Sequence, residues 1–381
     1  MSVYKFKEIP NNDTILVDTN DHCTIKENMV INNYTIIKYL GEGAFSQVWK
    51  AFDKNLNIDV VLKIHKSNKK NTDIAMNEYN ILKNLNHPNI ITAYTSFIYK
   101  QKYLVIVLEY LGDSLSTCKH HFRGDYNDDS DSDDDDKKNI QCMPNEVIKK
   151  IMYQIFDGLS YLHNDKKIIH TDLKLGNIML TKKMHNINSI DDFHIKIIDF
   201  GTSHSTNSKC KYHIGTYEYN APEMIIGYPY NTSIDIWSIG CIYFEILTGY
   251  CLFDCNKYYN NSNSSNSSNE TLYSSNSESD DEEVFNIENL LLAMISKTIG
   301  KIPGKIYKRG KFFEVFYNNK GNLKQSPAFL EEMNIHKTLT HNYNFTDEYA
   351  TINTNFILLM LNNYPDKRIT AKKILSNSYF N

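Results

Sequence analysis

Two polar clusters in the middle of the chain carry residue types that suit chemistry on phosphate. The segment IIHTDLKLGNIML contains Asp172, Lys174 and Asn177, and the later segment IKIIDFG contains Asp199. Two carboxylates and an amide, each in a polar break after an apolar run, suit metal binding and the positioning of a hydroxyl nucleophile. These residues are the strongest candidates for a catalytic centre.

A glycine turn and a lysine lie far upstream of these clusters. The residues GEGAFSQV place glycine at positions 41 and 43 and Ser46 where a third glycine would complete a GxGxxG pattern. Glycine lets a backbone approach a polyphosphate closely. Taken alone, this pattern is more often an ordinary hairpin turn, and the strand that follows it fits neither a Rossmann nor a Walker arrangement.

Lys63 ends the apolar segment VVLK, fifteen residues after Val48. It could hold phosphate oxygens, and Glu78 on the following predicted helix could orient it. As an isolated pair the two residues are equally a surface salt bridge, which contributes about 0 to 1 kcal/mol.

The elements that would position these residues follow from hydrophobic periodicity. Two strands are predicted around the glycine turn over residues 34–51, and further strands over 58–64 and 103–111, with one helix over 73–85. Beyond residue 111 the pattern becomes mainly helical, with predicted helices at 145–163, 233–247, 287–299 and 351–361. A small sheet with one helix therefore precedes a larger helical body.

The charge of the chain is unevenly distributed. The net charge is −4 over 381 residues, yet residues 124–139 alone carry −6 and residues 256–283 carry −5. The rest of the chain is therefore mildly basic. Both acidic stretches are too polar to offset the entropy of ordering, so we expect them to be disordered surface loops.

Composition excludes several classes of protein. The chain has no apolar run of about 18 residues and no basic start followed by an apolar stretch, so neither a membrane span nor a secretory signal is expected. Seven scattered cysteines indicate reduced thiols and an intracellular location, in the cytoplasm or nucleus. The abundance of Asn, Ile, Lys and Tyr is typical of an AT-rich genome, such as that of a protist or a large DNA virus, in which case the compartment is that of the host.

Further polar residues have simpler interpretations. The spacing of His204, Cys210 and His213 matches no common zinc pattern. Cys251 and Cys255 are expected to be buried thiols after a core helix.

The order of the motifs is specific. HxDxKxxN, DFG, then APE at Ala221–Glu223, DIWSIG from Asp235 and a late Arg368 follow one another. Over residues 34–380 the chain thereby resembles the eukaryotic protein kinases. Lys174, two residues after the catalytic aspartate, resembles the serine/threonine class.

The resemblance implies an α+β bilobal fold. It comprises an N-terminal extension over 1–33, a β-rich lobe over 34–110 and a helical lobe over 111–381 that carries the two acidic inserts. A hinge near residues 109–112 and a gatekeeper at Leu108 are implied as well. The reaction implied is transfer of the γ-phosphoryl group of Mg-ATP to Ser or Thr of a protein.

Residue roles also follow from the resemblance. Asp172 would accept the hydroxyl proton, Lys174 would contact the γ-phosphate, and Asn177 and Asp199 would hold Mg²⁺. The nucleotide would lie against a larger set that includes the glycine turn: Leu40, Gly41, Glu42, Gly43, Ala44, Phe45, Ser46, Val48, Val61, Lys63, Glu78, Glu109, Leu111 and Met179.

Within the kinases, the chain resembles the SR-protein kinases, in the group that includes cyclin-dependent and mitogen-activated kinases. HTD in place of HRD, the strand LVIVLEYLG and the block over 290–324 carry it. Protein substrates that are basic or Arg/Ser-rich are therefore implied, with a monomeric enzyme that binds neither nucleic acid nor membrane. Asn220 replaces an arginine before APE, and Lys297 stands near where acidic residues would grip an arginine-rich substrate, so this specificity stays open.

Two alternatives and one regulatory hypothesis remain. A pseudokinase would bind nucleotide without efficient transfer, and a small-molecule kinase would lack the peptide platform that residues 215–223 and 235–240 resemble. Thr171 replaces the arginine that holds a phosphorylated activation loop in many kinases. We therefore expect constitutive activity, without phosphorylation at Ser203, Ser205, Thr206 or Ser208.

Overall fold

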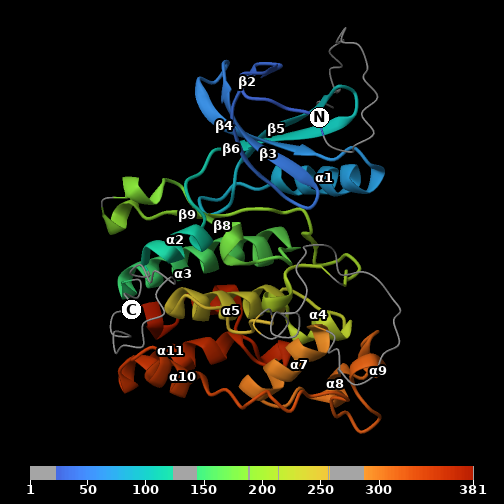
Figure 1. The fold of residues 1–381 in the computed structure, drawn as a ribbon, viewed down its shortest axis with the longest axis vertical. Helices are drawn as coiled ribbons and strands as arrows, with labels where there is room; N and C mark the ends of the chain where they lie inside the picture. Colours follow the sequence, from blue (N-terminus) through green and yellow to red (C-terminus); the bar gives the residue numbers. More distant parts are fainter. Residues whose placement is uncertain are drawn as a thin grey trace, which may run out of the picture. The chain divides into compact units, whose positions relative to one another are not determined.

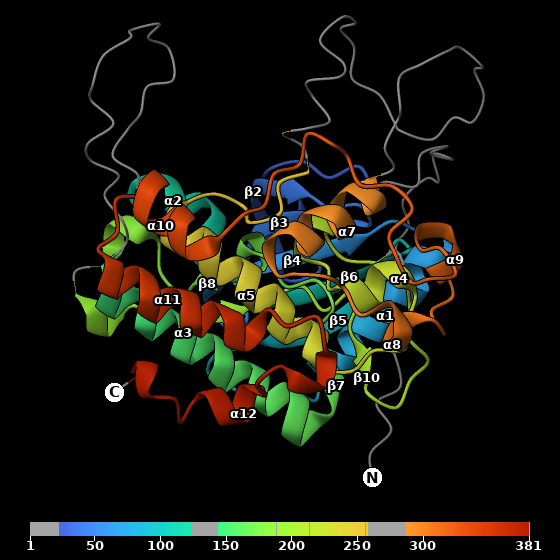
Figure 2. The same ribbon diagram turned by 90° about the horizontal axis from the view of Figure 1, so that it is seen from below.

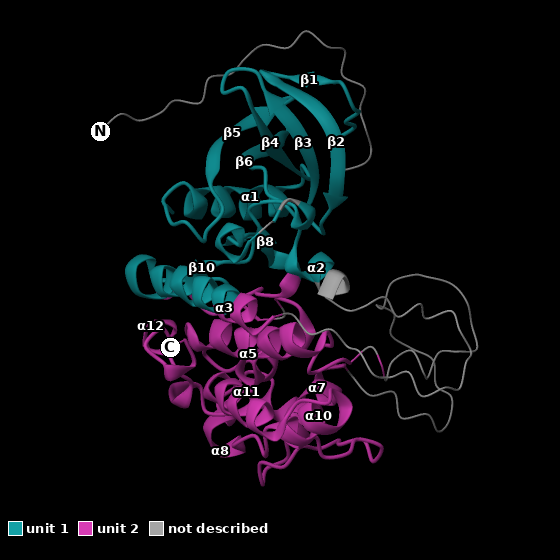
Figure 3. Cartoon of the chain, turned by 90° about the vertical axis from the view of Figure 1, so that its left-hand side faces the viewer, with its two compact units in different colours: residues 1–118, 150–170, 176–205 teal, residues 119–149, 171–175, 206–381 magenta. Residues whose placement is uncertain are grey.

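The computed structural model describes residues 23–122, 144–187, 189–212, 214–255, 257 and 287–380. The acidic stretch 124–139 lies outside the described residues, as does 256–283 except for residue 257. The predicted disorder of these stretches therefore stays a prediction. The chain divides into two compact units (Figure 3): Met1–Cys118, Lys150–His170 and Gly176–Ser205 form the first, and Lys119–Lys149, Thr171–Leu175 and Thr206–Asn381 form the second.

An antiparallel six-stranded sheet forms the first part of unit 1, in the order β1-β2-β3-β4-β6-β5 (Figure 1). Its strands are β1 Val30–Ile31, β2 Tyr34–Glu42, β3 Ser46–Asp53, β4 Ile58–His65, β5 Ala93–Tyr99 and β6 Tyr103–Glu109. The strands predicted around the glycine turn and over 58–64 and 103–111 are confirmed. The sequence did not indicate β5, an edge strand in which only Tyr99 is buried, because it has neither an apolar run nor a regular alternation.

The core of this sheet begins before Tyr34. Cys23, Ile25 and Ile31 are buried in one cluster with Tyr34, Ile36 and residues of the central strands. The strand β6, which lies between β4 and β5, is buried from Tyr103 to Leu108. Part of the expected N-terminal extension thus contributes to the packing of the sheet.

Helix α1, Lys69–Leu82, contacts β4, β5 and β6. It begins four residues earlier than predicted because the side chain of Asn68 caps it, accepting a hydrogen bond from the backbone of Asn71. Ala75, Glu78 and Leu82 form its buried side. Glu78 is the only one of these three residues that can carry a charge, and burying an isolated carboxylate is costly.

Short paired strands complete unit 1. β8 (Ile178–Leu180) pairs with β9 (Ile195–Ile197), and β7 (Ile168–Ile169) pairs with β10 (His204–Ser205). Helix α2, Leu115–Phe122, begins in this unit, and α3, Asn145–Ser160, ends in it. The predicted helix over 145–163 continues as a π-helical turn from Tyr161 to Lys166, and Lys167 then ends it in a left-handed conformation.

Unit 2 is helical. Its helices are α4 Pro222–Ile226, α5 Ser233–Thr248, α7 Ile287–Thr298, α8 Gly304–Tyr307, α9 Phe313–Phe316, α10 Ile335–Asn342, α11 Asp347–Met360 and α12 Ala371–Ile374. Helix α5 is buried from Ile234 to Thr248 and packs against α11, and α10 also contacts α11 (Figure 2). The long predicted helices are confirmed, with α11 starting four residues earlier than expected.

The described residues bear on two expectations, one about free cysteines and one about membrane-spanning helices. Six cysteines there are free thiols, as predicted, and Cys255 is buried as expected, whereas Cys251 is only half-buried. None of the described helices combines the length and apolarity needed to span a membrane.

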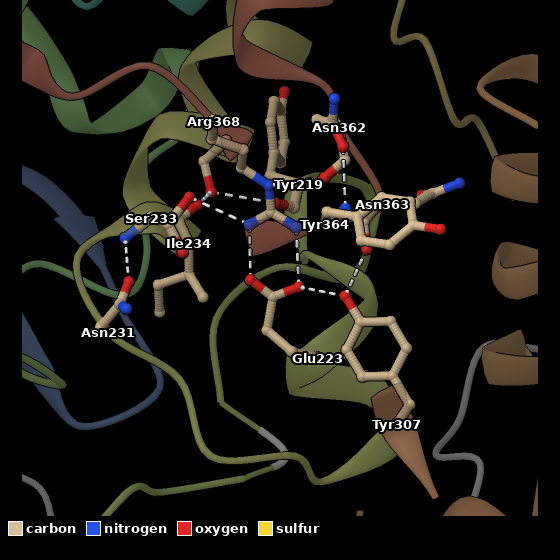
Figure 4. A network of polar contacts seen from close by, with 11 residues as sticks. Tyr219, Glu223, Asn231, Ser233, Ile234, Tyr307, Asn362, Asn363, Tyr364 and Arg368 are labelled. Carbon is tan, nitrogen blue, oxygen red and sulfur yellow. Dashed lines mark hydrogen bonds and ion pairs between the residues drawn. The ribbon is translucent and has the colours of Figure 1, made fainter. Parts of the chain in front are cut away.

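A buried ion pair joins the APE segment to the end of unit 2 (Figure 4). Glu223 accepts two hydrogen bonds from Arg368, at 2.5 and 2.8 Å, and both side chains are fully buried. The hydroxyl of Tyr307 lies 3.4 Å from Glu223 and donates to the backbone oxygen of Asn363. The guanidinium also lies 4.9 Å from the ring of Trp237. Both charges are therefore paired despite their burial.

We expect Arg368→Met to lower the free energy of unfolding by about 3–5 kcal/mol, because it leaves Glu223 buried without its counter-charge. The measurement is urea denaturation followed by circular dichroism. Arg309→Met, at an exposed position of the same unit, is the matched control and should change stability by less than about 0.5 kcal/mol. Equal midpoints for the two variants would contradict the prediction.

Candidate active site

Three charged side chains from separate elements meet in unit 1. Lys63 on β4 donates to Glu78 on α1 at 2.7 and 2.9 Å, and to Asp199 Oδ1 at 2.9 Å. Lys63 is 14% exposed and Glu78 is 1% exposed, whereas Asp199 is 43% exposed. The pair that sequence alone could not distinguish from a surface salt bridge is therefore a buried ion pair.

Each of these charges fixes the protonation of the others. Burial alone would lower the pKa of Lys63, but the carboxylates of Asp199 and Glu78 raise it above its ordinary value. Burial alone would raise the pKa of Glu78, but the ammonium of Lys63 lowers it. Lys63 also holds the pKa of Asp199 well below its usual range. All three groups are therefore charged at neutral pH.

His65 belongs to this cluster, although it was not among the residues predicted from the sequence. It is 2% exposed, with Nε2 3.3 Å from Glu78 Oε2, and among the described residues its Nδ1 has no partner. Residues two apart on a strand point to the same face. Its position two residues after Lys63 was the signal that could have revealed it.

We expect Lys63→Met to lower stability by about 3–5 kcal/mol at pH 8, because Glu78 would remain buried without its cation. Without Lys63, burial would raise the pKa of Glu78, so folding would take up a proton and the loss would shrink as the pH falls toward 5. In the wild type both carboxylates have lowered pKa values, so the stability they contribute is present above about pH 4 and is lost only below it. Urea denaturation at several pH values measures this difference.

Two further variants control that experiment. Lys63→Met/Glu78→Gln should recover most of the lost stability, since no buried carboxylate remains. Lys50→Met removes a lysine from a more exposed pair with Asp59 and should cost no more than about 1 kcal/mol. A pH-independent loss in Lys63→Met would show that packing, not charge, determines the effect.

The segment after Asp199 contacts both α1 and His170, which is the last residue of the Lys150–His170 part of unit 1. Phe200 is fully buried with its ring 4.9 Å from that of His170. Ser203 donates its hydroxyl to the backbone oxygen of His170 at 3.0 Å, and Asn77 on α1 donates to the backbone oxygen of Ser203 at 3.0 Å. Asp199 itself has a positive φ of 64°. These contacts hold the backbone that presents its carboxylate.

The glycine turn is a closed hairpin with open space beside it. The backbone of Gly43 donates to Ser46 at 2.8 Å. A Cβ built on Gly41 would meet nothing within 4 Å, and one on Gly43 would meet Ser46 only at 3.9 Å. Packing therefore does not require glycine at these positions, although the backbone φ of 157° favours glycine at Gly41. Bare backbone facing free space is the feature that suits close approach of phosphate groups.

Further residues predicted to lie against the nucleotide belong to strands and loops of unit 1. Val61 on β4 is paired with Leu108 on β6, and both are largely buried. Met179 on β8 bridges to Ser114, just beyond Leu111. Gly112 is indispensable there, since a Cβ would come within 2.0 Å of the backbone oxygen of Lys182. Glu109, also in the predicted nucleotide set, is the last residue of β6. Five further members lie in or next to the glycine turn: Leu40, Glu42, Ala44, Phe45 and Val48.

Asn177 and Asp199 lie in adjacent segments, because the backbone oxygen of Asn177 accepts a hydrogen bond from Ile198 at 2.9 Å. Lys63 holds Oδ1 of Asp199, while the side chain remains 43% exposed. An ionised carboxylate and an amide are hard oxygen donors of the type that Mg²⁺ prefers. The two residues therefore fit a magnesium site in their chemistry.

Asp172 and Lys174 lie in unit 2 and share a third residue. Lys174 Nζ is 3.2 Å from Asp172 Oδ2 and donates to the hydroxyl of Thr216 at 2.9 Å, and that hydroxyl donates to Asp172 Oδ1 at 2.9 Å. Thr216 was not among the predicted residues, and its place just before the APE segment was the only signal. The cluster holds a carboxylate beside a hydroxyl, which is the arrangement that general-base chemistry on an alcohol requires.

The backbone before Asp172 is strained and fixed. Thr171 has φ of 74°, unusual for a β-branched residue, and its N–H donates to buried Asp235 Oδ1 at 2.9 Å. Asp235 belongs to the DIWSIG motif, which thus holds the backbone before Asp172. The zinc alternative gains no support, because the described residues contain no group of three His, Cys, Asp or Glu that could hold a metal, and His213 lies outside them.

Comparison with known proteins decides the family. Residues 34–380 match the family described as "Protein kinase domain". The chain is a member of the protein kinase family. This result confirms the α+β kinase fold, the resemblance to protein kinases of the serine/threonine type and the assignment as an enzyme.

Named relatives agree with this membership. The kinase is 27% identical to "Serine/threonine-protein kinase SRPK" of Physarum polycephalum over 91% of this chain and 86% of the relative. It is 34% identical to "Probable dual specificity protein kinase YAK1 homolog" of Encephalitozoon cuniculi and 31% identical to human "Dual specificity tyrosine-phosphorylation-regulated kinase 4", over 58% of this chain in each case. It spans less than half of the length of the latter two, 49% and 39%.

Proposed function

We propose that this protein kinase transfers the γ-phosphoryl group of ATP to Ser or Thr hydroxyls of protein substrates. The observation that carries the proposal is the buried cluster in which Lys63 bonds to both Glu78 and Asp199. Such a cluster keeps a charged lysine and an ionised, partly exposed carboxylate fixed in place. Phosphoryl transfer depends on positioning and electrostatic stabilisation of this kind.

Each residue of the kinase would contribute one step. Lys63 would hold phosphate oxygens with its ammonium while Glu78 fixes its orientation. Asp172 would orient the substrate hydroxyl and accept its proton, and Lys174 would neutralise charge that develops on the transferred group. In the observed conformation the Thr216 hydroxyl donates a hydrogen bond to Asp172 Oδ1. A substrate hydroxyl would bind the same carboxylate in the same way.

Asn177 and Asp199 would hold magnesium. When bound, Mg²⁺ neutralises phosphate charge and so assists the departure of the leaving group. The role of this chain is to keep Asp199 ionised, which the neighbouring ammonium of Lys63 does by lowering its pKa.

We also propose a preference for basic or Arg/Ser-rich sequences around the acceptor hydroxyl. Its support is the similarity over 86% of a relative named as an SRPK. Other relatives carry the name "dual specificity". A peptide library with Ser, Thr and Tyr acceptors would measure acceptor class and flanking preference together.

We expect Asp172→Asn to reduce phosphorylation of a protein mixture by at least about 10³-fold, because no carboxylate remains to accept the proton. Radioactive ATP measures the rate, and EDTA should abolish it in the wild type. Asp191→Asn removes an exposed carboxylate and is the matched control, with a rate close to that of the wild type. Wild-type protein that binds nucleotide yet transfers no phosphate would instead establish the pseudokinase alternative.

We further propose that the activation loop is ordered without phosphorylation. Tyr230 fixes Lys211 from both sides: its hydroxyl accepts from the backbone N–H at 2.9 Å and donates to the backbone oxygen at 2.8 Å. The ring of Tyr212 packs edge-on against Tyr230 and Phe312. Ser203, one of the candidate phosphorylation sites, is fully buried and uses its hydroxyl internally. Uncharged contacts thus support the loop where other kinases use a phosphate and an arginine.

The wild-type kinase, expressed in bacteria and treated with phosphatase, should therefore work without a lag. Tyr230→Phe should lower this rate several-fold, because Lys211 loses both hydrogen bonds, at about 1 kcal/mol each. Tyr228→Phe removes the hydroxyl of a neighbouring, partly buried tyrosine and is the control. Initial rates test this, after mass spectrometry has confirmed an unmodified loop. A large rate increase on loop phosphorylation of the wild type would overturn the proposal.

A further inference from the structure

One segment of unit 2 is strongly basic. Residues 297–324 contain eight Lys or Arg residues and one Glu, in a chain whose net charge is −4. Lys297 is half-buried, and the other seven basic residues are exposed. The segment runs from the end of α7 through α8 and α9 (Figure 1). A local excess of this size attracts anionic groups.

The charges of this segment are not compensated within the described parts of the chain. None of the eight is paired with a carboxylate there. Lys301 donates instead to the side-chain oxygen of Asn322 at 2.8 Å, and Lys324 donates to the backbone oxygen of Glu314. Elsewhere, exposed Lys182 pairs with Asp192 at 2.8 Å. The absence of carboxylate partners distinguishes this segment from such pairs.

A pocket of about 650 Å³ lies at this segment. Its lining includes Lys297, Lys301, Tyr317, Asn322, Glu332 and Asn334. Two chain segments approach closely at the lining residue Gly321, because a Cβ on Gly304 would come within 2.8 Å of its backbone oxygen. Two ammonium groups and one exposed carboxylate therefore border a preformed hollow.

Tyr317 supplies a second, independent observation. It is 3% exposed, and its buried hydroxyl has no hydrogen-bond partner among the described residues. Burial raises its pKa, so the hydroxyl stays protonated and able to donate. An unsatisfied buried donor costs about 1–3 kcal/mol. An oxygen acceptor bound in the pocket would relieve this cost.

We propose that this basic pocket docks an acidic, Asp/Glu-rich segment of a protein substrate. Lys297 and Lys301 would pair with its carboxylates, and Tyr317 would donate to a carboxylate oxygen. The pocket offers no open aromatic ring for base stacking, since Tyr317 is buried, and this favours a peptide over single-stranded nucleic acid. Docking would raise the effective concentration of an acceptor site on the same substrate. The effect of docking on phosphorylation rests on the proposed kinase function.

Binding is measured first, without ATP. The probe is a fluorescein-labelled twelve-residue Asp/Glu-rich peptide, and the readout is fluorescence anisotropy with the full chain. Lys297→Glu/Lys301→Glu should weaken binding at least about tenfold, because attraction becomes repulsion. Lys372→Glu/Lys373→Glu makes the same change of charge on α12 at exposed positions and is the matched control, with unchanged affinity. Higher salt should weaken wild-type binding.

Tyr317→Phe separates a docking role from a structural one. It removes only the hydroxyl, so the melting temperature should stay the same or rise while affinity for the peptide falls several-fold. Unchanged affinity would remove Tyr317 from the proposed site.

The outcomes are distinguishable. Equal affinity of both double variants, or no binding by the wild type, would overturn the proposal even in an active kinase. A single-stranded DNA oligonucleotide or phosphatidylserine vesicles could bind more tightly than the peptide and lose binding in the same double variant. This result would identify nucleic acid or an anionic lipid surface, and not a protein segment, as the ligand of the pocket. Peptide binding that appears only after residues 258–283 are replaced by a Gly/Ser linker would show that the chain's own acidic stretch is the occupant.

Kinetics then connect docking with phosphorylation. For a substrate that joins an acceptor site to an acidic segment, Lys297→Glu/Lys301→Glu should raise KM with little change in kcat. The same acceptor without the acidic segment should be phosphorylated equally by both proteins. Loss of kcat on both substrates would point to a structural defect and contradict the docking role, whereas absence of transfer in the wild type would refute only the proposed function.

Discussion

The ammonium of Lys63 between two carboxylates is the interaction on which the first unit depends. It joins β4 to α1 through Glu78 and to the segment after β9 through Asp199. Since Glu78 is almost fully buried, α1 can pack against the sheet at low cost only while this cation is present. The same bond keeps Asp199 ionised. The side-chain nitrogen of Lys63 therefore serves both the packing of α1 and the ionisation of Asp199.

Two buried carboxylates of unit 2 are each stabilised by a specific partner in the same way as Glu78. Glu223 and Arg368 are paired in full burial, and this pair fixes the APE segment just after the activation loop. Asp235 holds the strained backbone of Thr171, which directly precedes Asp172. In each case a charged side chain is tolerated in the interior because it binds a specific partner, and each partner belongs to a kinase motif.

The proposed loop order and the proposed substrate docking rest on weaker contacts than these ion pairs. Tyr230 makes two hydrogen bonds to the backbone of Lys211 and packs against Tyr212, and these contacts support the proposal that the loop is ordered without phosphorylation. The basic segment over 297–324 shows the opposite condition, since its charges lack carboxylate partners in the described residues. Charges that a fold leaves unpaired at a pocket are available to a ligand.

The sequence by itself determined the family, the strands β2, β3, β4 and β6 and the long helices, because motif order and hydrophobic period are local properties of the chain. It also indicated Lys63, Glu78 and Asp199 as candidates. Only the tertiary structure decided that these three form one buried cluster with His65, that Thr216 joins Asp172 and Lys174, and that Lys297 and Lys301 border one pocket. The edge strand β5 was missed because partial exposure leaves no period to detect. Long-range pairing is set by the packing of distant elements, which no local pattern encodes.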